Sequence, residues 1–294
     1  MIDRQELAYL VDLFDDSDGT VASCVDKRIR EMGREVIPEL ERMRHDEADL
    51  ARKRLISDRI TQYNADLRIE DLRRLAMDGS IEAYTLYEGC FLASSMLNPQ
   101  VSREQFEEAF YQCTYQYHSE ASDMRTAVEN IGIFNHIFFH RLRFTLCDQN
   151  ITTEKNAMIY DALRSRRGNP FVIAAIYMMM AEDANLPVFP LCFPGGFVPA
   201  YVENGRELFY INLNGNGEIF PQSRLKDYMI EQGIAFDHNR YLIRRRTVVL
   251  NIYLESLSYL YGQIGNPAMQ QRIQKTLAAL GDERFLLSDD KQED

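Results

Sequence analysis

Apolar residues recur at helical spacing through the first hundred residues. Residues 21–32 place their apolar side chains on one helical face, Gly33 closes this helix, and residues 36–43 continue the pattern in a second one. A third helical pattern runs over residues 56–67. Short turns join these helices, so we expect residues 1–98 to form a helical N-terminal region, arranged as a small right-angled or solenoid-like stack of helix pairs. The copies are too few and too different to define a repeat array.

The middle of the chain continues as helix. Ser102 and Gln105 have the spacing of a capping box, and the helical pattern behind them runs to about Leu146. Residues 156–164 predict one more helix. Pro170 suits the first position of the next helix, and the run behind it is so uniformly apolar that this helix is expected to be buried on most sides. The tyrosines and methionines of these helices are interpreted as core residues: Tyr115, Tyr117, Met178, Met179 and Met180.

The pattern changes to strands after Pro187. The stretch CFPGGFVPAYV has the layout of a strand, a tight turn and a second strand, and a turn at Asn204 and Gly205 leads into a third strand. A fourth short strand is expected over residues 218–221. These strands predict a short antiparallel sheet.

The C-terminal part returns to helix. A long helix over residues 241–263, a turn at residues 265–267 and a shorter helix to Leu280 predict a helical hairpin. The last stretch, SDDKQED, is expected to be a disordered acidic tail. The fold class is therefore α+β, with a buried central helix against the sheet. The expected division is residues 1–98 helical N-terminal region, 99–238 core, 239–282 helical hairpin and 283–294 acidic tail.

Charge and composition narrow the class of protein. A net charge of -12 and a pI near 5.0 count against nucleic acid and anionic lipid as partners, because both need a concentrated basic face. The longest apolar run, residues 171–181, is about half the length that crosses a bilayer, and the N-terminal sequence lacks the pattern of a secretory signal. Five scattered cysteines without a CxxC pair suit a reducing compartment. We expect a cytoplasmic protein without membrane contact.

Three stretches carry a family resemblance: NAMIYDALRSRRGNPFVIAAIY, LPVFPLCFPGGF and FYINLNGNGEIF. Together they resemble the transglutaminase-like core of the bacterial SirB-type proteins, which runs Arg-x-Gly-x-Pro, a buried helix, Leu-Pro, Pro-Gly-His-Phe and a strand ending Asp-Pro before a glycine. The positions in register are Asn156, Arg166, Gly168, Pro170, Leu186, Pro187, Pro194, Gly195, Phe197 and Gly215. The N-terminal helix pairs and the C-terminal hairpin also resemble the segments that flank this core in the family.

The resemblance implies a degenerate active site. Transglutaminase-like enzymes place a cysteine at the start of the buried helix, and a histidine and an aspartate on neighbouring strands to activate it. The corresponding positions here are Pro170, Gly196 and Asn212. Asparagine is compatible with such chemistry, but proline cannot act as the nucleophile and glycine cannot act as the base. The resemblance thus implies no catalytic residues, and we expect these three positions to lie together around one cleft.

Two other constellations suggest catalysis or metal binding. Cys192 lies two residues before the Pro-Gly-Gly-Phe turn and is a candidate displaced nucleophile, although a cysteine on an apolar strand is usually a small core residue, and nothing in the sequence brings His238 to it. His136 and His140 have an i, i+4 spacing that can hold zinc, but no third ligand is evident. The alternative for this pair is an interhelical packing face.

An arginine cluster is the strongest candidate for ligand binding. Arg164, Arg166 and Arg167 stand beside Gly168 at the start of the buried helix, a setting that suits a carboxylate or phosphate. The alternative is that these arginines pair with the chain's own acids, and Arg166 in particular is expected to be braced against an internal acid. The candidate binding residues are Arg164, Arg166, Arg167, Gly168, Gly195, Gly196 and Asn212.

The functional hypothesis is a pseudoenzyme. A transglutaminase-like cleft without nucleophile or base would bind a protein or peptide partner, with the helical flanks as further contact surface and with no cofactor and no metal. The alternative is a cysteine-dependent hydrolase or acyl transferase with a rearranged site. The oligomeric state, the partner and the pathway stay open.

Overall fold

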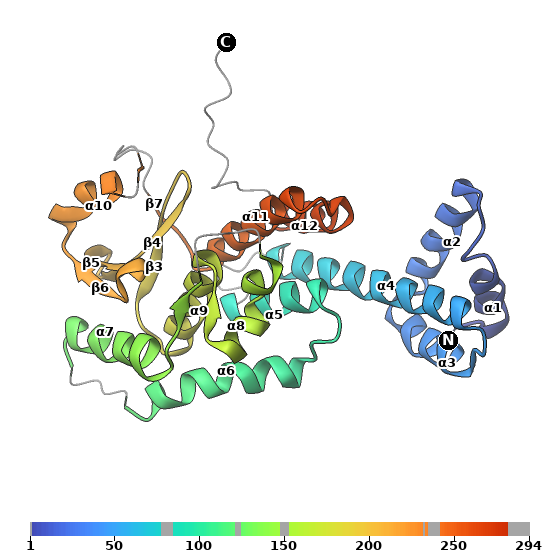
Figure 1. Ribbon diagram of the computed structural model, residues 1–294, viewed down its shortest axis with the longest axis horizontal. Coiled ribbons are helices and arrows are strands. Elements are labelled where there is room, and N and C mark those ends of the chain that lie inside the picture. The colour runs from blue at the N-terminus through green and yellow to red at the C-terminus, as the bar shows by residue number, and fades with distance from the viewer. Residues whose placement is uncertain are drawn as a thin grey trace, which may run out of the picture.

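The protein is elongated, with a small group of helices at one end and a larger mixed body at the other (Figure 1). The computed structural model describes residues 2–77, 85–120, 125–147, 153–231, 233–234 and 242–281. The small group is built from α1 (Arg4–Asp12), α2 (Gly19–Glu31), α3 (Val36–Asp46) and the first half of α4 (Leu50–Met77).

The N-terminal helices enclose an apolar cluster of their own. Its buried members are Leu7, Val11, Phe14, Val25, Ile29, Val36, Leu40, Ile56, Ile60 and Tyr63. Asp3 and Asp18 cap α1 and α2 by accepting hydrogen bonds from backbone N–H groups of the first turn. The Asp26 carboxylate accepts hydrogen bonds from Arg59 and from the Tyr63 hydroxyl, each at 2.8 Å, and so joins α2 to α4. The expected helical character of this region is confirmed.

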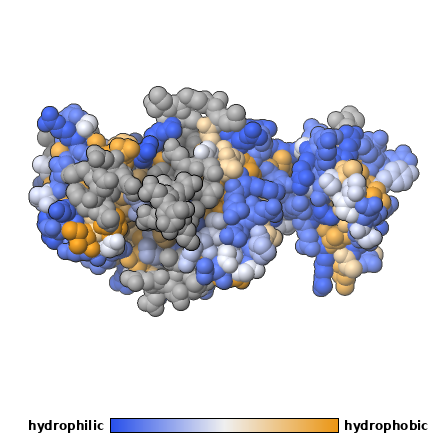
Figure 2. Space-filling model, turned by 90° about the horizontal axis from the view of Figure 1, so that it is seen from above, coloured by the Kyte–Doolittle hydropathy of each residue, from blue (hydrophilic) through white to orange (hydrophobic). Residues whose placement is uncertain are grey.

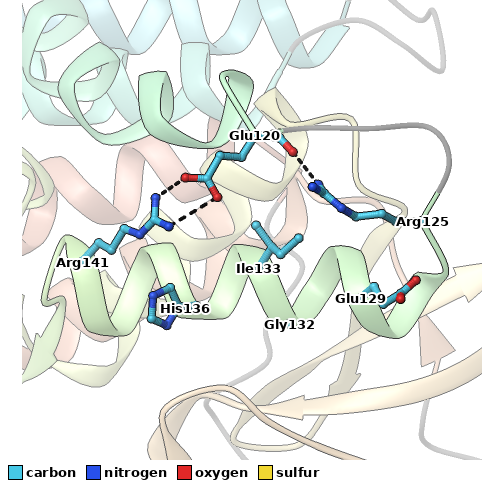
Figure 3. A pocket seen from close by; sticks show the side chains of 7 residues that line it. All are labelled: Glu120, Arg125, Glu129, Gly132, Ile133, His136 and Arg141. Atoms are coloured by element: carbon cyan, nitrogen blue, oxygen red, sulfur yellow. Dashed lines mark hydrogen bonds and ion pairs between the residues drawn. The ribbon is translucent and has the colours of Figure 1, made fainter.

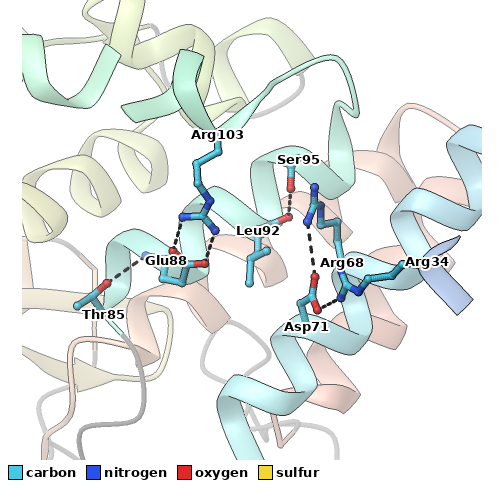
Figure 4. A network of polar contacts seen from close by, with 8 residues as sticks. All are labelled: Arg34, Arg68, Asp71, Thr85, Glu88, Leu92, Ser95 and Arg103. Atoms are coloured by element: carbon cyan, nitrogen blue, oxygen red, sulfur yellow. Dashed lines mark hydrogen bonds and ion pairs between the residues drawn. The ribbon is translucent and has the colours of Figure 1, made fainter. Parts of the chain in front are cut away.

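Helix α4 connects the two parts of the molecule. It has 28 residues and is therefore about 42 Å long. Tyr63 belongs to the N-terminal cluster, whereas Ala65 and Leu72 belong to the main core. At the junction, Asp71 forms ion pairs with Arg34 from the N-terminal group and with Arg68 on the preceding turn of α4 (Figure 4).

The main body is organised around one central helix, α9 (Pro170–Asp183). The other helices packed in this body are α5 (Leu86–Leu97), α6 (Arg103–His118), α7 (Ala127–Asn135), α8 (Ile159–Ser165), α10 (Leu225–Glu231), α11 (Val248–Gln263) and α12 (Pro267–Ala279). Residues Ala175 to Met179 are fully shielded from solvent, as the uniformly apolar sequence predicts. The predicted C-terminal hairpin corresponds to α11 and α12, which pack against each other. The predicted boundary at residue 98 falls between α5 and α6, which share the main core, and stays a prediction.

The single helical run expected from residue 101 to residue 146 is wrong in its second half. The capping box of Ser102 and Gln105 is present and starts α6, but that helix ends at His118. A new helix, α7, begins after a second capping box at Thr126 and Glu129, and it continues as a π-helical segment over His136–Arg141. Residues Thr145–Leu146 form β1, which pairs in parallel with β2 (Arg167–Gly168).

The sheet has the strand order β6-β5-β4-β3-β7, and all neighbours are antiparallel. Its strands are β3 (Val188–Phe193), β4 (Gly196–Glu203), β5 (Arg206–Asn212), β6 (Glu218–Phe220) and β7 (Leu242–Ile243). Pro194 and Gly195 make the tight turn between β3 and β4, and Asn204 and Gly205 make the next turn with positive φ at both residues. Both turns are where the sequence predicts them, and the α+β class is confirmed.

Strand β7 corrects the expected start of the C-terminal helix. Leu242 and Ile243 pair with the free edge of β3 instead of beginning the helix, which starts at Val248. The connection is held by Arg246, whose guanidinium donates to the carbonyl oxygens of Val188 at 2.8 Å and Leu186 at 2.5 Å and lies 4.4 Å from the centre of the Phe189 ring. These partners are more than 50 residues away in sequence, so local periodicity could not reveal them.

The face of the molecule seen from above is mostly hydrophilic (Figure 2). Figure 2 shows a polar covering along α4 and the N-terminal group, with apolar atoms in small separate areas. No helix that the structure describes combines the length and apolar character needed to cross a bilayer.

Candidate functional site

The start of α9 is the centre of the candidate site. Pro170 occupies the first helical position, and the Asn169 side chain caps the helix by accepting from the Val172 N–H at 2.9 Å. Gly168 is buried, and a Cβ at this position would lie 3.0 Å from Cγ1 of Val172 and 3.3 Å from Cβ of Ala162. The Arg-x-Gly-x-Pro motif therefore has a packing role here, since glycine lets α8 and α9 approach closely.

Gly196 begins β4, directly after the tight turn. A Cβ at Gly196 would meet only the Phe193 ring edge, at 3.8 Å, so the site has room for a larger side chain. Gly195 has φ of 101°, a conformation that favours glycine. Gly196 itself has φ of 156°, a conformation that residues with a side chain rarely adopt, so a histidine at this position would be strained by the backbone although space is available.

Pro170, Gly196 and Asn212, the three positions to which the family resemblance points, lie on elements that meet. Phe171 and Phe197, the residues directly after Pro170 and Gly196, pack against one apolar cluster of Cys192, Val248 and Ile252. Asn212 ends β5, and because β4 and β5 are antiparallel, the end of β5 and the start of β4 lie at the same end of the sheet. The carboxamide of Asn212 accepts a hydrogen bond from the Gly215 N–H at 3.1 Å and so caps the turn that follows.

The thiols of the main body are buried. Cys90, Cys113, Cys147 and Cys192 are shielded from solvent, and Cys24, the exposed thiol, lies on α2 in the N-terminal group. Burial raises the pKa of Cys113 to about 11, although Arg166 beside it acts in the opposite direction. The Cys90 pKa is also raised by burial. The thiols of Cys90 and Cys113 are therefore protonated at neutral pH.

Cys147 is the cysteine that sequence reasoning overlooked. Its backbone N–H donates to the carbonyl oxygen of Gly168 at 2.8 Å. Because Gly168 is two residues before Pro170, this hydrogen bond places Cys147 beside the start of α9. The pairing of β1 with β2 brings it there, and strands of two residues leave no usable signal in the sequence. Cys192 also comes close to this helix, through its contact cluster with Phe171.

The three arginines differ in exposure: Arg166 is partly buried, whereas Arg164 and Arg167 are exposed. Arg166 adopts φ of 62° at the end of α8, and its guanidinium donates to the Leu163 carbonyl oxygen and contacts the Cys113 sulfur at 2.6 Å. It is braced against a carbonyl and a thiol, and the internal acid expected for it is not among these partners. Arg164 and Arg167 are exposed and form no ion pair with any residue that the structure describes. Arg164 lies over the Tyr160 ring, with its guanidinium carbon 5.7 Å from the centroid.

A further cation joins this surface through the short parallel pairing. Thr145 pairs with Arg167, and Arg143, two residues before Thr145, is exposed with φ of 60°. Arg143 also lacks an ion pair within the described part of the chain. The sequence offered no reason to group Arg143 with Arg167, because 24 positions separate them.

His136 and His140 do not form the packing face considered as their alternative role. Both are exposed on the π-helical segment, with ring centroids 5.4 Å apart, whereas Ile137, Phe138 and Phe139 between them are buried. Within the described residues, no group of three or more His, Cys, Asp or Glu side chains is placed to hold a metal ion. His238 lies outside the described residues.

An open pocket of about 340 Å³ lies beside His136, between the end of α6 and α7 (Figure 3). Its lining residues are Glu120, Arg125, Glu129, Gly132, Ile133, His136 and Arg141. Glu120 pairs with Arg141 through its carboxylate and with Arg125 through its backbone carbonyl. The Glu129 carboxylate accepts from the Thr126 N–H at 2.8 Å. Each of the charged side chains Glu120, Arg125, Glu129 and Arg141 therefore has a hydrogen-bond partner within the protein.

A buried polar triad holds the core behind the candidate site. The Tyr177 hydroxyl donates to Oδ1 of Asn135 at 2.7 Å, and Nδ2 of Asn135 donates to the Gly217 carbonyl oxygen at 2.6 Å. This triad joins α7, α9 and the turn between β5 and β6. Gly217 has φ of 83°, and a Cβ there would lie 2.6 Å from Cγ of Asn135, so the close approach requires glycine.

Comparison with known proteins supports the assignment of this region. Residues 104–244 match the family model Transglut_core2, described as the transglutaminase-like superfamily. No curated protein and no solved structure gives a match. The matched stretch begins in α6 and ends directly after β7, so it includes α9 and the whole sheet. Residues 104–244 of this chain are a transglutaminase-like superfamily domain.

Proposed function

We propose that this domain is a non-catalytic member of the SirB type, and that it binds a protein or peptide partner at the start of α9. The observation that carries the proposal is the pair Pro170 and Gly196, which occupy the positions of nucleophile and base that the resemblance implies. Neither side chain can attack a carbonyl or move a proton. The use of the Asn212 carboxamide as a cap for the following turn supports the same conclusion.

The binding surface that we propose is the exposed cationic face made by Arg164 and Arg167, together with Arg143. In a chain of net charge -12, these guanidinium groups without described acidic partners form a local positive area. Guanidinium groups bind carboxylates in bidentate geometry, so the partner segment that fits is acidic. Arg166 supports the backbone beneath this face through its bond to the Leu163 carbonyl.

The test is retention of partner proteins on immobilised full-length protein. We expect Arg164→Ala with Arg167→Ala to lose the retained partner, most clearly at low salt, where charge contacts are strongest. The matched control is Arg54→Ala with Arg73→Ala, two exposed arginines of α4. Unchanged retention by the first pair would exclude this face, and loss in the control pair alone would move the binding site to the helical flank.

The alternative function is a cysteine-dependent hydrolase or acyl transferase with a rearranged site. The observation in its favour is the position of Cys147, whose backbone N–H bonds the Gly168 carbonyl beside the start of α9. This alternative requires a thiol that reacts unusually fast at neutral pH. We expect iodoacetamide to label Cys24 first and the buried thiols only on unfolding. Amidase or transamidase turnover that disappears in Cys147→Ala or Cys192→Ala would establish the alternative and overturn the proposal.

A further inference from the structure

The outward face of α6 carries two adjacent tyrosines that the core does not use. Tyr111 and Tyr115 are 56% and 57% exposed, and their ring centroids are 5.7 Å apart. The sequence pattern suggested that Tyr115 is a core residue like Tyr117, and this is wrong. The inward face of α6 is filled by Phe106, Ala109, Phe110, Cys113, Thr114 and Tyr117. Tyr115 therefore points away from the body, and Figure 1 shows α6 along the outer edge of the molecule.

Acidic side chains continue the same face toward the start of the helix. Glu104, Glu108, Tyr111 and Tyr115 follow one another at spacings of four, three and four residues, so they form one stripe about 16 Å long. Glu107 lies beside this stripe. All five side chains are exposed. We call these five residues the outer face of α6.

The carboxylates of the outer face form no ion pair with a cation among the described residues, although the Glu104 carboxylate accepts from Ser102 and from its own backbone N–H. Arg103, the nearest basic residue in the chain, is engaged elsewhere, since its guanidinium forms two hydrogen bonds with Glu88 at 2.6 and 2.8 Å (Figure 4). Glu108 accepts from the neutral carboxamide of Gln112 at 2.7 Å. Three carboxylates without an ion-pair partner among the described residues, next to two exposed aromatic rings, make a surface that attracts a cation.

This combination fits arginine better than other side chains. A guanidinium can stack on the face of a tyrosine ring and donate paired hydrogen bonds to a neighbouring carboxylate. The tyrosines also offer a rigid apolar area that loses little conformational freedom on binding. Charge complementarity thus selects a cationic occupant, and the aromatic pair selects arginine over lysine within that class.

We propose that the outer face of α6 is a docking surface for an arginine-containing, cationic segment of a partner protein. This surface shares no residue with the cationic face of Arg164 and Arg167 and takes a segment of opposite charge. The two surfaces can therefore be tested independently of each other.

The experiment measures binding of a fluorescein-labelled peptide of alternating arginine and glycine to the full-length protein by fluorescence anisotropy. We expect Tyr111→Ala with Tyr115→Ala to weaken binding at least tenfold, and the corresponding double Phe variant to retain it, because phenylalanine keeps the ring face. A peptide with lysine in place of arginine should bind several-fold more weakly. Circular dichroism verifies that each variant is folded.

The matched control separates docking from general attraction to an acidic protein. Changing Glu104, Glu107 and Glu108 to Gln should weaken binding and reduce its salt dependence. The control changes three exposed acids elsewhere on the domain, Glu203→Gln, Asp227→Asn and Glu231→Gln, and should alter affinity less than twofold. Equal losses in the two triple variants, unchanged binding in the tyrosine-to-alanine variant, or no binding by the wild-type protein at low salt would each overturn the proposal.

Discussion

The hydroxyl of Tyr177 provides a quantitative test of how the core behind the candidate site is held together. Tyr177 is fully buried, and burial raises its pKa well above the ordinary value, so it is a neutral donor at every pH of interest. Its partner, Oδ1 of Asn135, is 2.7 Å away in a side chain that is 8% exposed. Tyr177→Phe keeps the ring and its aromatic contacts with Phe134 and Phe138, and removes only this bond.

The expected loss of unfolding free energy follows from the acceptor that Tyr177→Phe leaves without a donor. Oδ1 of Asn135 would become a buried acceptor without a donor, while Nδ2 keeps its bond to Gly217. An orphaned buried acceptor costs about 1–3 kcal/mol of unfolding free energy. Each kcal/mol lowers the melting temperature by about 2–4 °C for a chain approaching this size.

Urea unfolding followed by far-ultraviolet circular dichroism measures the change. The control is Tyr115→Phe, the same chemical change at an exposed position, which should stay within about 0.5 kcal/mol of wild type. In an Asn135→Ala background the loss from Tyr177→Phe should shrink to less than half, because no acceptor remains to be orphaned. A Tyr177→Phe protein as stable as the Tyr115→Phe control would refute the reasoning.

Two further changes test backbone strain and a buried acid. Gly217→Ala should destabilise the protein by more than about 2 kcal/mol, because a non-glycine residue in this backbone conformation is strained and the new Cβ would lie 2.6 Å from Cγ of Asn135. Gly205→Ala, with a similar φ and no atom within 4 Å, should cost only about 1 kcal/mol in the same urea unfolding assay. Burial raises the pKa of Glu182 above its ordinary value of 4.5, so the folded state binds the proton more tightly and wild-type stability falls as pH rises through and above that value. Glu182→Gln, which keeps an acceptor for the Leu86 N–H, should lack this fall, and equal pH profiles of urea unfolding for the two proteins would contradict the assignment.

Features that depend on a few consecutive residues could be predicted from the sequence. The capping box at Ser102, the proline at the start of α9 and the turn at Asn204 and Gly205 all satisfy backbone groups within their own segment. The uniformly apolar run after Pro170 likewise predicted a buried helix, because no polar face was available for solvent. For the candidate site, the register of the motifs predicted which residues stand where the family has its nucleophile and base.

Features that depend on partners far apart in the chain could not be predicted. Leu242 and Ile243 became a strand because β3 offered them an unpaired edge, and Arg246 found two carbonyl acceptors almost 60 positions away. The same holds for Cys147 beside Gly168 and for Asn135 beside Gly217. In each case the energy comes from a contact that exists only after the chain has folded.

The sequence alone therefore determined the α+β class of this protein and the places where many elements begin. It also led to the prediction that Pro170 and Gly196 stand where the family has its nucleophile and base. Tertiary structure decided which polar groups remain available at the surface. It turned Arg166 inward against Leu163 and Cys113 and left Arg164 exposed, and it placed Tyr115 outside although its helical pattern resembles that of the buried Tyr117. The physical reason is that the apolar pattern of a helix shows only roughly which side faces the core. Whether a side chain near the edge of that side is buried depends on the neighbours that pack against it.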